Sequence, residues 1–183
     1  MKKYASIFVF ALLAAVAGAQ TKPDTPASEP KWQTLSDSAF LIEYPSNWTA
    51  DQTGNLGVRF ILMSPTDSDT DAFRENINLN ITDLGAPDVI NLDLFAEAAE
   101  EQIKQYITAA QVLRSARISP TNGQAAYHEI EFTGDQGGST LHWKQHYRLK
   151  GRYAYILTFT AHHNAYDQHL KLANKIMESF KVL

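Results

Sequence analysis

Three turn sequences divide the C-terminal half of the chain into short segments, and this spacing restricts the fold more than any other feature. The turns are Asn122-Gly123, the glycine-rich run from Gly134 to Gly138, and Lys150-Gly151. A crossover between parallel strands needs a dozen or more residues, and these connections are much shorter. Consecutive segments are therefore predicted to form hairpins of an antiparallel sheet.

Seven segments have the apolar and alternating character of strands. Tyr153–Thr160 is apolar on both faces, which predicts a central strand. The other six are Phe40–Tyr44, Leu56–Met63, Ile77–Leu84, Val112–Ile118, Ala125–Phe132 and Thr140–Leu149.

Two further segments repeat apolar residues at the 3.6-residue spacing of a helix. The first runs from Leu92 to Ala110, where Asn91 is the candidate N-cap, and the second from about Asn164 to Ser179. Three strands, a helix, four strands and a helix are typical of an α+β fold. We expect a single antiparallel β-sheet packed between α-helices, which is an αβα sandwich.

The N-terminus has the pattern of a secretory signal peptide. Lys2 and Lys3 precede an apolar run, Ile7–Val16, which is shorter than the roughly 20 residues of a membrane span. Ala17-Gly18-Ala19 supplies the small-x-small pattern of a cleavage site. We expect a signal peptide over residues 1–19 and an exported, soluble product that begins at Gln20 and has no membrane span. The alternative is an uncleaved membrane anchor.

The remaining chain divides into two parts. Residues 20–35 contain three prolines among small polar residues and are predicted to be a flexible tether. Residues 36–183 are predicted to form a single domain. The chain has no cysteine, which excludes disulfides, thiolate metal sites and a lipid anchor on cysteine.

Charge is distributed unevenly along the chain. The formal net charge is −4, which becomes −6 when Lys2 and Lys3 are removed. Residues 20–110 carry a net charge of −10, and residues 111–183 carry +4. Nucleic acid is not an expected partner, because binding its phosphates requires a broad basic field. A local basic face in the C-terminal half agrees with this distribution.

The predicted strand from Thr140 to Lys150 has two contrasting faces, because its side chains alternate. Leu141, Trp143, Tyr147 and Leu149 share one face, which is expected to face the core. The opposite face is expected to be exposed to solvent and carries a basic row of His142, Lys144, His146, Arg148 and Lys150.

Centring the hairpins on their turns predicts which side chains neighbour this row. The predicted pairs are Glu131–His142, Glu129–Lys144, Tyr127–His146, Tyr155–His146 and Tyr153–Arg148. Two interpretations follow: a solvated face held by cross-strand charge pairs, or a basic, aromatic docking surface for an acidic partner. On the second interpretation the candidate binding residues are Tyr127, His142, Lys144, His146, Arg148, Tyr153 and Tyr155.

An acidic segment resembles the start of a calcium loop but departs from its pattern. Asp67-x-Asp69-x-Asp71 supplies clustered carboxylates. However, Ala72 stands where the loop needs glycine, and Asn78 stands where it needs a bidentate glutamate. This segment is interpreted as a solvated acidic loop.

A histidine-rich segment is the other metal candidate. A helix would place His163 and Asp167 on one face, with His162 and His169 nearby, but two ligands do not make a zinc site. Neither a nucleophile elbow nor a His-Glu-x-x-His motif is present. We expect no bound metal, no cofactor and no enzymatic activity.

Phe40–Trp48 contains a Tyr-Pro-x-x-Trp motif at the end of a predicted strand. Four further segments carry recognisable motifs: Asn76–Leu79, Asn122–Tyr127, Tyr153–Ala161 and Ile176–Phe180. In these segments the chain resembles the PsbP-like family, which includes the extrinsic photosystem II protein PsbP and the DcrB-type bacterial envelope proteins. The resemblance covers residues 36–183 and implies an antiparallel sheet between helices, with a non-catalytic envelope or assembly role.

Together these features predict an exported, non-enzymatic binding or assembly protein of the bacterial envelope. It is expected in the periplasm or outside the cell, with another envelope protein as its partner. The alternative is a periplasmic small-ligand or metal-binding protein, which is favoured by six histidines that all lie between His128 and His169.

Overall fold

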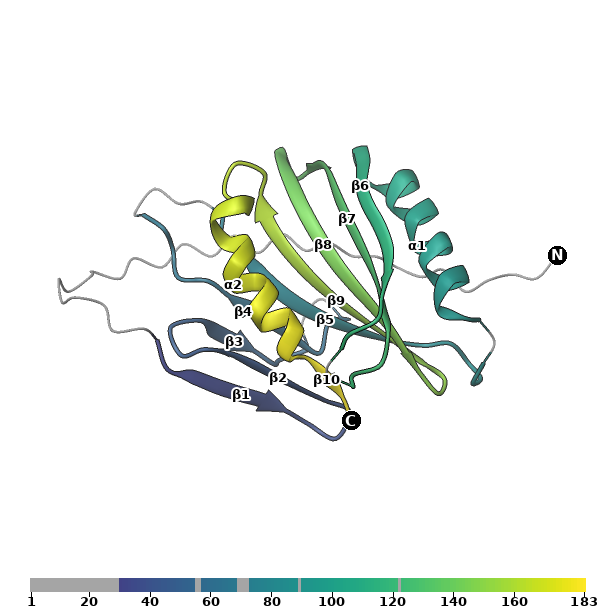
Figure 1. Cartoon of the computed structure of the whole chain (residues 1–183). Helices are drawn as coiled ribbons and strands as arrows, with labels where there is room; N and C mark the ends of the chain where they lie inside the picture. Colours follow the sequence, from purple (N-terminus) through teal and green to yellow (C-terminus); the bar gives the residue numbers. More distant parts are fainter. Residues whose placement is uncertain (1–29, 55–56, 69–72, 89, 122) are drawn as a thin grey trace.

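The computed structural model describes residues 30–54, 57–68, 73–88, 90–121 and 123–183. The predicted signal peptide and residues 20–29 of the predicted tether lie outside these ranges. The described chain forms a seven-stranded sheet, a three-stranded sheet and two α-helices (Figure 1). No helix within the described ranges is long and apolar enough to cross a membrane.

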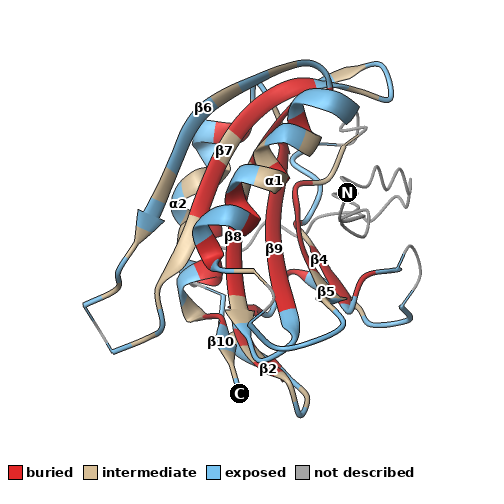
Figure 2. Cartoon of the chain, turned by 90° about the vertical axis from the view of Figure 1, so that its right-hand side faces the viewer, coloured by how far each residue is buried: buried red, intermediate tan, exposed pale blue. Residues whose placement is uncertain are grey.

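The large sheet is antiparallel throughout, as the short connections predict. Its strand order is β3-β4-β5-β9-β8-β7-β6, so β9 is central, as its apolar faces predict. The seven strands are β3 (Thr49–Asp51), β4 (Phe60–Met63), β5 (Asn76–Asp83), β6 (Thr108–Ile118), β7 (Tyr127–Gln136), β8 (Ser139–Lys150) and β9 (Tyr153–His162). Figure 2 shows β7, β8 and β9 buried over most of their length, whereas β6 forms an exposed edge.

The prediction of a single sheet is wrong, because a second sheet is present. It consists of β1 (Trp32–Ser36), β2 (Phe40–Pro45) and β10 (Lys181–Val182). Residues 32–35, predicted to be tether, therefore belong to a strand. In β1 only Leu35 is buried, so its sequence lacks the apolar alternation that identifies a strand.

Both hairpins of β8 differ from the predicted register by two residues. Gln136 pairs with Ser139 across a two-residue turn in which Gly137 and Gly138 have φ angles of 60° and 84°. Positive φ at both central residues is the requirement of a type I′ hairpin turn, and glycine meets it without steric cost. Lys150 pairs with Tyr153 across the second turn. A shift of two residues changes the paired partners but keeps each side chain on its predicted face.

Helix α1 (Leu92–Tyr106) covers one face of the large sheet. The Asn91 side chain caps it by accepting a 2.9 Å hydrogen bond from the Leu94 amide, as predicted. Phe95, Ala99 and Ile103 of this helix belong to one buried cluster with Phe132, Trp143, Tyr147 and other sheet residues. The helix ends earlier than its apolar repeat predicts, and β6 begins at Thr108 instead of Val112.

Helix α2 (Tyr166–Ser179) and the three-stranded sheet lie together over the opposite face (Figure 1). The buried residues of α2 are Tyr166, Ala173, Ile176 and Met177. They pack with side chains of β2, β4, β5 and β9 in a second buried cluster, which also contains Trp48. The large sheet therefore has a core on both faces.

We predict that Trp48→Ala lowers the free energy of unfolding by roughly 3–5 kcal/mol, because the Trp48 side chain is 3% exposed and its removal leaves a cavity. Urea unfolding followed by circular dichroism measures this loss. Trp32→Ala is the control, since the Trp32 ring is only partly buried and lies 4.2 Å from the Lys175 ammonium, and a smaller loss is expected. Equal losses for the two variants would show that Trp48 is not a core residue.

Candidate functional site

The basic row of β8 does not face solvent as predicted, because α2 packs over its face. His142, His146 and Arg148 are 8%, 2% and 5% exposed. Lys144 is partly buried and donates a 3.0 Å hydrogen bond to Asn174 Oδ1 of α2. Lys150, at the end of the strand, is exposed. The apolar stripe of α2 needs a sheet face to cover, and this requirement closes most of the expected docking surface.

Glu129 of β7 is the centre of a charge network in this row. Its carboxylate lies 3.1 Å from His146 Nε2, 3.2 Å from Lys144 Nζ and 3.0 Å from Arg114 Nε. Burial opposes ionisation of Glu129, but the hydrogen bond from His146 and the charge of Lys144 outweigh it and lower its pKa to about 2. Burial lowers the pKa of His146 to about 4, so His146 is neutral at pH 7.

His142 forms the next contact along the row. Its Nε2 lies 2.9 Å from Glu131 Oε1, and the Tyr166 ring of α2 stacks on it with 3.4 Å between the ring centroids. Burial lowers the pKa of His142 below its ordinary value. The two histidines of β8 are thus enclosed and bonded to carboxylates.

Three predicted contacts of the row occur despite the shifted register. Glu131–His142 and Glu129–Lys144 are in contact, and the Tyr127 and His146 rings lie 4.2 Å apart. These pairs are diagonal, because the residues directly opposite are Glu131 and Lys144, and Glu129 and His146. Long side chains reach diagonal neighbours across a sheet.

The two tyrosines of β9 do not lie where they were predicted. Tyr155 pairs with Arg148 instead of His146 and belongs to the buried cluster beneath α2. Tyr153 pairs with Lys150 instead of Arg148 and is 41% exposed. The structure therefore brings Tyr127, His146 and Arg148 together, whereas Tyr153 lies apart from them near the turn.

Arg148 marks the end of the row where α2 no longer closes the surface. Its guanidinium carbon lies 4.5 Å from the Tyr127 ring centroid and 5.3 Å from that of Phe180. Burial lowers the pKa of Arg148 to about 10, so the group stays charged at pH 7. Its Nη1 atom is buried and makes no hydrogen bond to any residue that the structure describes.

Two hollows meet at Arg148. The larger has a volume of about 450 Å³ and lies between the segment before β7 and the C-terminal strand β10. The smaller, of about 250 Å³, lies beside the end of β6. Arg148 and Gln124 line both hollows, Lys150 and Lys181 line the larger one, and Tyr127 and Glu178 line the smaller one. We call this region the Arg148 pocket.

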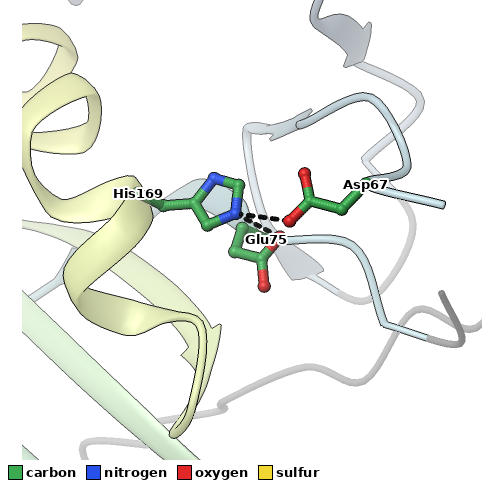
Figure 3. A group of neighbouring side chains, drawn as sticks. All are labelled: Asp67, Glu75 and His169. Atoms are coloured by element: carbon green, nitrogen blue, oxygen red, sulfur yellow. Dashed lines mark hydrogen bonds and ion pairs between the residues drawn. The ribbon is translucent and has the colours of Figure 1, made fainter.

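A second polar cluster joins residues that the sequence assigned to two unrelated metal candidates. His169 Nε2 of α2 lies 3.0 Å from Asp67 Oδ2 and 3.5 Å from Glu75 Oε2 (Figure 3). Glu75 was missed, since no motif marks it. Asp69 and Asp71 lie outside the described ranges. Within those ranges the group with metal-ligand spacing is Asp67, Glu75 and His169, not His163 with Asp167, because α2 begins only at Tyr166.

Comparison with known proteins identifies the fold. No protein-family model matches the chain, and a comparison with curated proteins gives no match. The solution structure of cyanobacterial PsbP (CyanoP) from Synechocystis sp. PCC 6803 aligns with a TM-score of 0.59 and 14% identity, over 90% of this chain and 98% of that one. The chain has a PsbP-like fold.

Two other structures share the PsbP-like fold with this chain. LpqN of Mycobacterium tuberculosis, which is involved in cell envelope biogenesis, aligns with a TM-score of 0.60 and 12% identity, over 83% of this chain and 90% of LpqN. The Ran-binding protein Mog1p of Saccharomyces cerevisiae aligns with a TM-score of 0.55 and 12% identity, over 85% of this chain and 96% of Mog1p. The resemblance predicted from the sequence motifs is therefore confirmed at the level of the fold.

We predict that acidification from pH 7 to pH 4 lowers the free energy of unfolding by roughly 2–3 kcal/mol, which pH-dependent urea unfolding measures. Burial makes His146 favour its neutral form in the folded state. Its contribution to the free energy of unfolding is therefore present above pH 6.5 and is lost as the pH falls towards 4. Glu129 acts in the same direction between pH 4.5 and 2. His146→Gln should flatten the upper part of the profile, whereas His163→Gln, at an exposed position, should not. A profile that rises on acidification would contradict the network.

Proposed function

We propose that this protein is an exported, non-enzymatic binding or assembly protein of the bacterial envelope, and that it docks another envelope protein at the Arg148 pocket. The signal-peptide pattern of residues 1–19 supports export. The PsbP-like fold, shared with CyanoP and with LpqN of envelope biogenesis, supports an envelope role. Mog1p, a Ran-binding protein, shares the fold as well, which agrees with a binding role.

The enclosure of the histidines supports a binding role over catalysis. A general base must reach the proton that it removes. His142 and His146 lie beneath α2 or within the charge network, and both are hydrogen-bonded to carboxylates. His146 therefore presents no ring nitrogen to a substrate arriving from solvent, and Glu131 occupies the Nε2 atom of His142.

The observation that carries the proposal is the open end of the β8 row at the Arg148 pocket. Here a buried cation, the aromatic rings of Tyr127 and Phe180, and two hollows lie together. Exposed Lys150 and Lys181 border the larger hollow and add positive charge. An acidic segment of a partner protein complements this surface in charge, and Arg with Tyr is the residue pairing that protein interfaces favour.

Site-specific photo-crosslinking in intact cells tests this function. A photoreactive residue in place of Ala125, which is exposed and lines the larger hollow, should give a discrete adduct with another envelope protein. The same residue in place of Glu97, exposed on α1, is the matched control and should not give that adduct. The exported protein should also have the mass of a chain that begins at Gln20. No adduct from Ala125, or the same adduct from both positions, would refute docking at this pocket.

The Asp67, Glu75 and His169 cluster supports a second candidate function, binding of a divalent transition metal such as Zn²⁺. Imidazole and carboxylate ligands suit this ion, and ligands about 2.1 Å from a tetrahedral zinc lie about 3.4 Å apart. The distances from His169 Nε2 to the two carboxylates, 3.0 and 3.5 Å, bracket that value. In Figure 3 the three side chains point toward one another from α2 and from the chain on either side of residues 69–72.

Calorimetric titration of the metal-free protein with ZnCl₂ tests the second candidate. We predict binding of one Zn²⁺, with an affinity that falls about tenfold or more in His169→Gln, because one of three protein ligands is lost. His163→Gln removes an exposed histidine of the neighbouring loop and should bind as the unaltered protein does. Equal affinity in both variants would show that the cluster only holds α2 against the β4–β5 segment.

A further inference from the structure

Arg148 differs from the five other arginines in the partners of its guanidinium. Arg74 donates hydrogen bonds to the main-chain oxygens of Ser64 and Met63 and to the Thr49 hydroxyl. Arg59, Arg114, Arg117 and Arg152 have side chains 45–55% exposed, and each lies within 3.0 Å of an Asp or Glu oxygen. Arg148 is only 5% exposed, yet it forms no ion pair with a described carboxylate. Among the described residues, the arginine most removed from water thus has neither an ion pair nor a hydrogen bond at Nη1.

The surroundings of Arg148 offset only part of the free-energy cost of burying its charge. Burying a cation without a counter-charge is unfavourable, and the ring faces of Tyr127 and Phe180 supply a weaker attraction in its place. Both rings hold the planar guanidinium without occupying the hydrogen-bonding positions of Nη1. A guanidinium held in this way is preorganised for an anion that enters from outside.

The hollows beside Arg148 admit such an anion. Their volumes, about 450 and 250 Å³, are sufficient for an acidic side chain or the end of a peptide. The charged groups that line them are Arg148, Lys150 and Lys181 on the positive side and Glu178 on the negative side. Glu178 borders only the smaller hollow, where it opposes an anion, so an anion reaches Arg148 through the larger hollow, which Lys150 and Lys181 line.

We propose that Arg148 receives a single carboxylate group, supplied by an acidic side chain or chain terminus of the docked partner, between the Tyr127 and Phe180 rings. This inference rests on the proposed docking function and names the group that the pocket recognises. The carboxylate accepts charge-assisted hydrogen bonds from the guanidinium and neutralises the buried cation. Lys181 attracts it to the larger hollow together with Lys150, whose ammonium also donates a hydrogen bond to the main-chain oxygen of Leu183.

Titration of ¹⁵N-labelled mature protein with sodium acetate, monitored at the arginine Nε–Hε signals, tests the proposal. We expect a saturable shift of the Arg148 signal that sodium chloride at equal ionic strength does not produce. Sodium phosphate is the comparison for a partner that carries a phosphate group. If chloride gives the same shift, or if phosphate binds more tightly than acetate, the carboxylate assignment is wrong.

Arg148→Met removes the charge and keeps an unbranched side chain between the two rings. It should fold at least as stably as the original protein, because an unpaired buried cation is lost. The affinity for acetate, measured from the shifts of the Tyr127 and Phe180 ring signals, should fall by about tenfold or more. Arg59→Met, which alters an exposed and paired arginine, should retain the acetate affinity of the unaltered protein. If Arg148→Met fails to fold, Arg148→Lys keeps the charge without the planar fork, and full acetate affinity in that variant would refute recognition by the guanidinium.

The crosslinking position at Ala125 separates this inference from the proposed function. An adduct that disappears in Arg148→Met supports both. An adduct that persists in Arg148→Met refutes the role of Arg148 and leaves docking at the pocket intact. Acetate binding without any adduct in the unaltered protein refutes docking, while the carboxylate site itself stands.

Discussion

The packing of α2 on the β8–β9 face is the constraint on which the rest of the structure depends. The apolar stripe of α2 covers Leu157, Phe159 and Tyr155 of the central strand. Because β8 lies next to β9, the same helix also encloses His142, Lys144 and His146 of β8. Basic side chains that the strand pattern predicts to be exposed are thereby buried. Each of them then requires a hydrogen-bond or ion-pair partner.

Glu129 is the partner of Lys144 and His146 in the middle of the basic row. One carboxylate contacts three basic neighbours, forming ion pairs with Lys144 and Arg114 and a hydrogen bond with His146, which burial keeps neutral. Replacing such a network with apolar residues is often neutral or stabilising, so its presence is weak evidence for a contribution to stability. Its clearer effect is to fix the register of β7 against β8, since a shift would separate Glu129 from its partners.

How far the sequence predicts this structure depends on whether the determining contact is local. Alternation along β8 separated its two faces correctly, because that pattern is a property of the strand alone. The predicted register of β8 against β7 was wrong by two residues because Gly134 was counted with the turn between them. Gly134 instead lies inside β7, where a Cβ would stand 2.4 Å from Ile107 Cγ2, so glycine is required by an approach from a distant segment. Glu75 and His169 were not paired in the prediction for the same reason, since no local pattern joins them.

The position of Phe180 connects the fold to the pocket. Phe180 ends α2 and is part of the core beneath that helix, and its ring also covers one side of the Arg148 guanidinium. The Tyr127 ring also lies against the guanidinium, and Tyr127 is the first residue of β7, next to the segment that lines both hollows. The two walls that hold the cation are thus fixed by elements far apart in the sequence. A guanidinium confined in this way loses little rotamer freedom when an anion arrives, which lowers the entropic cost of recognition.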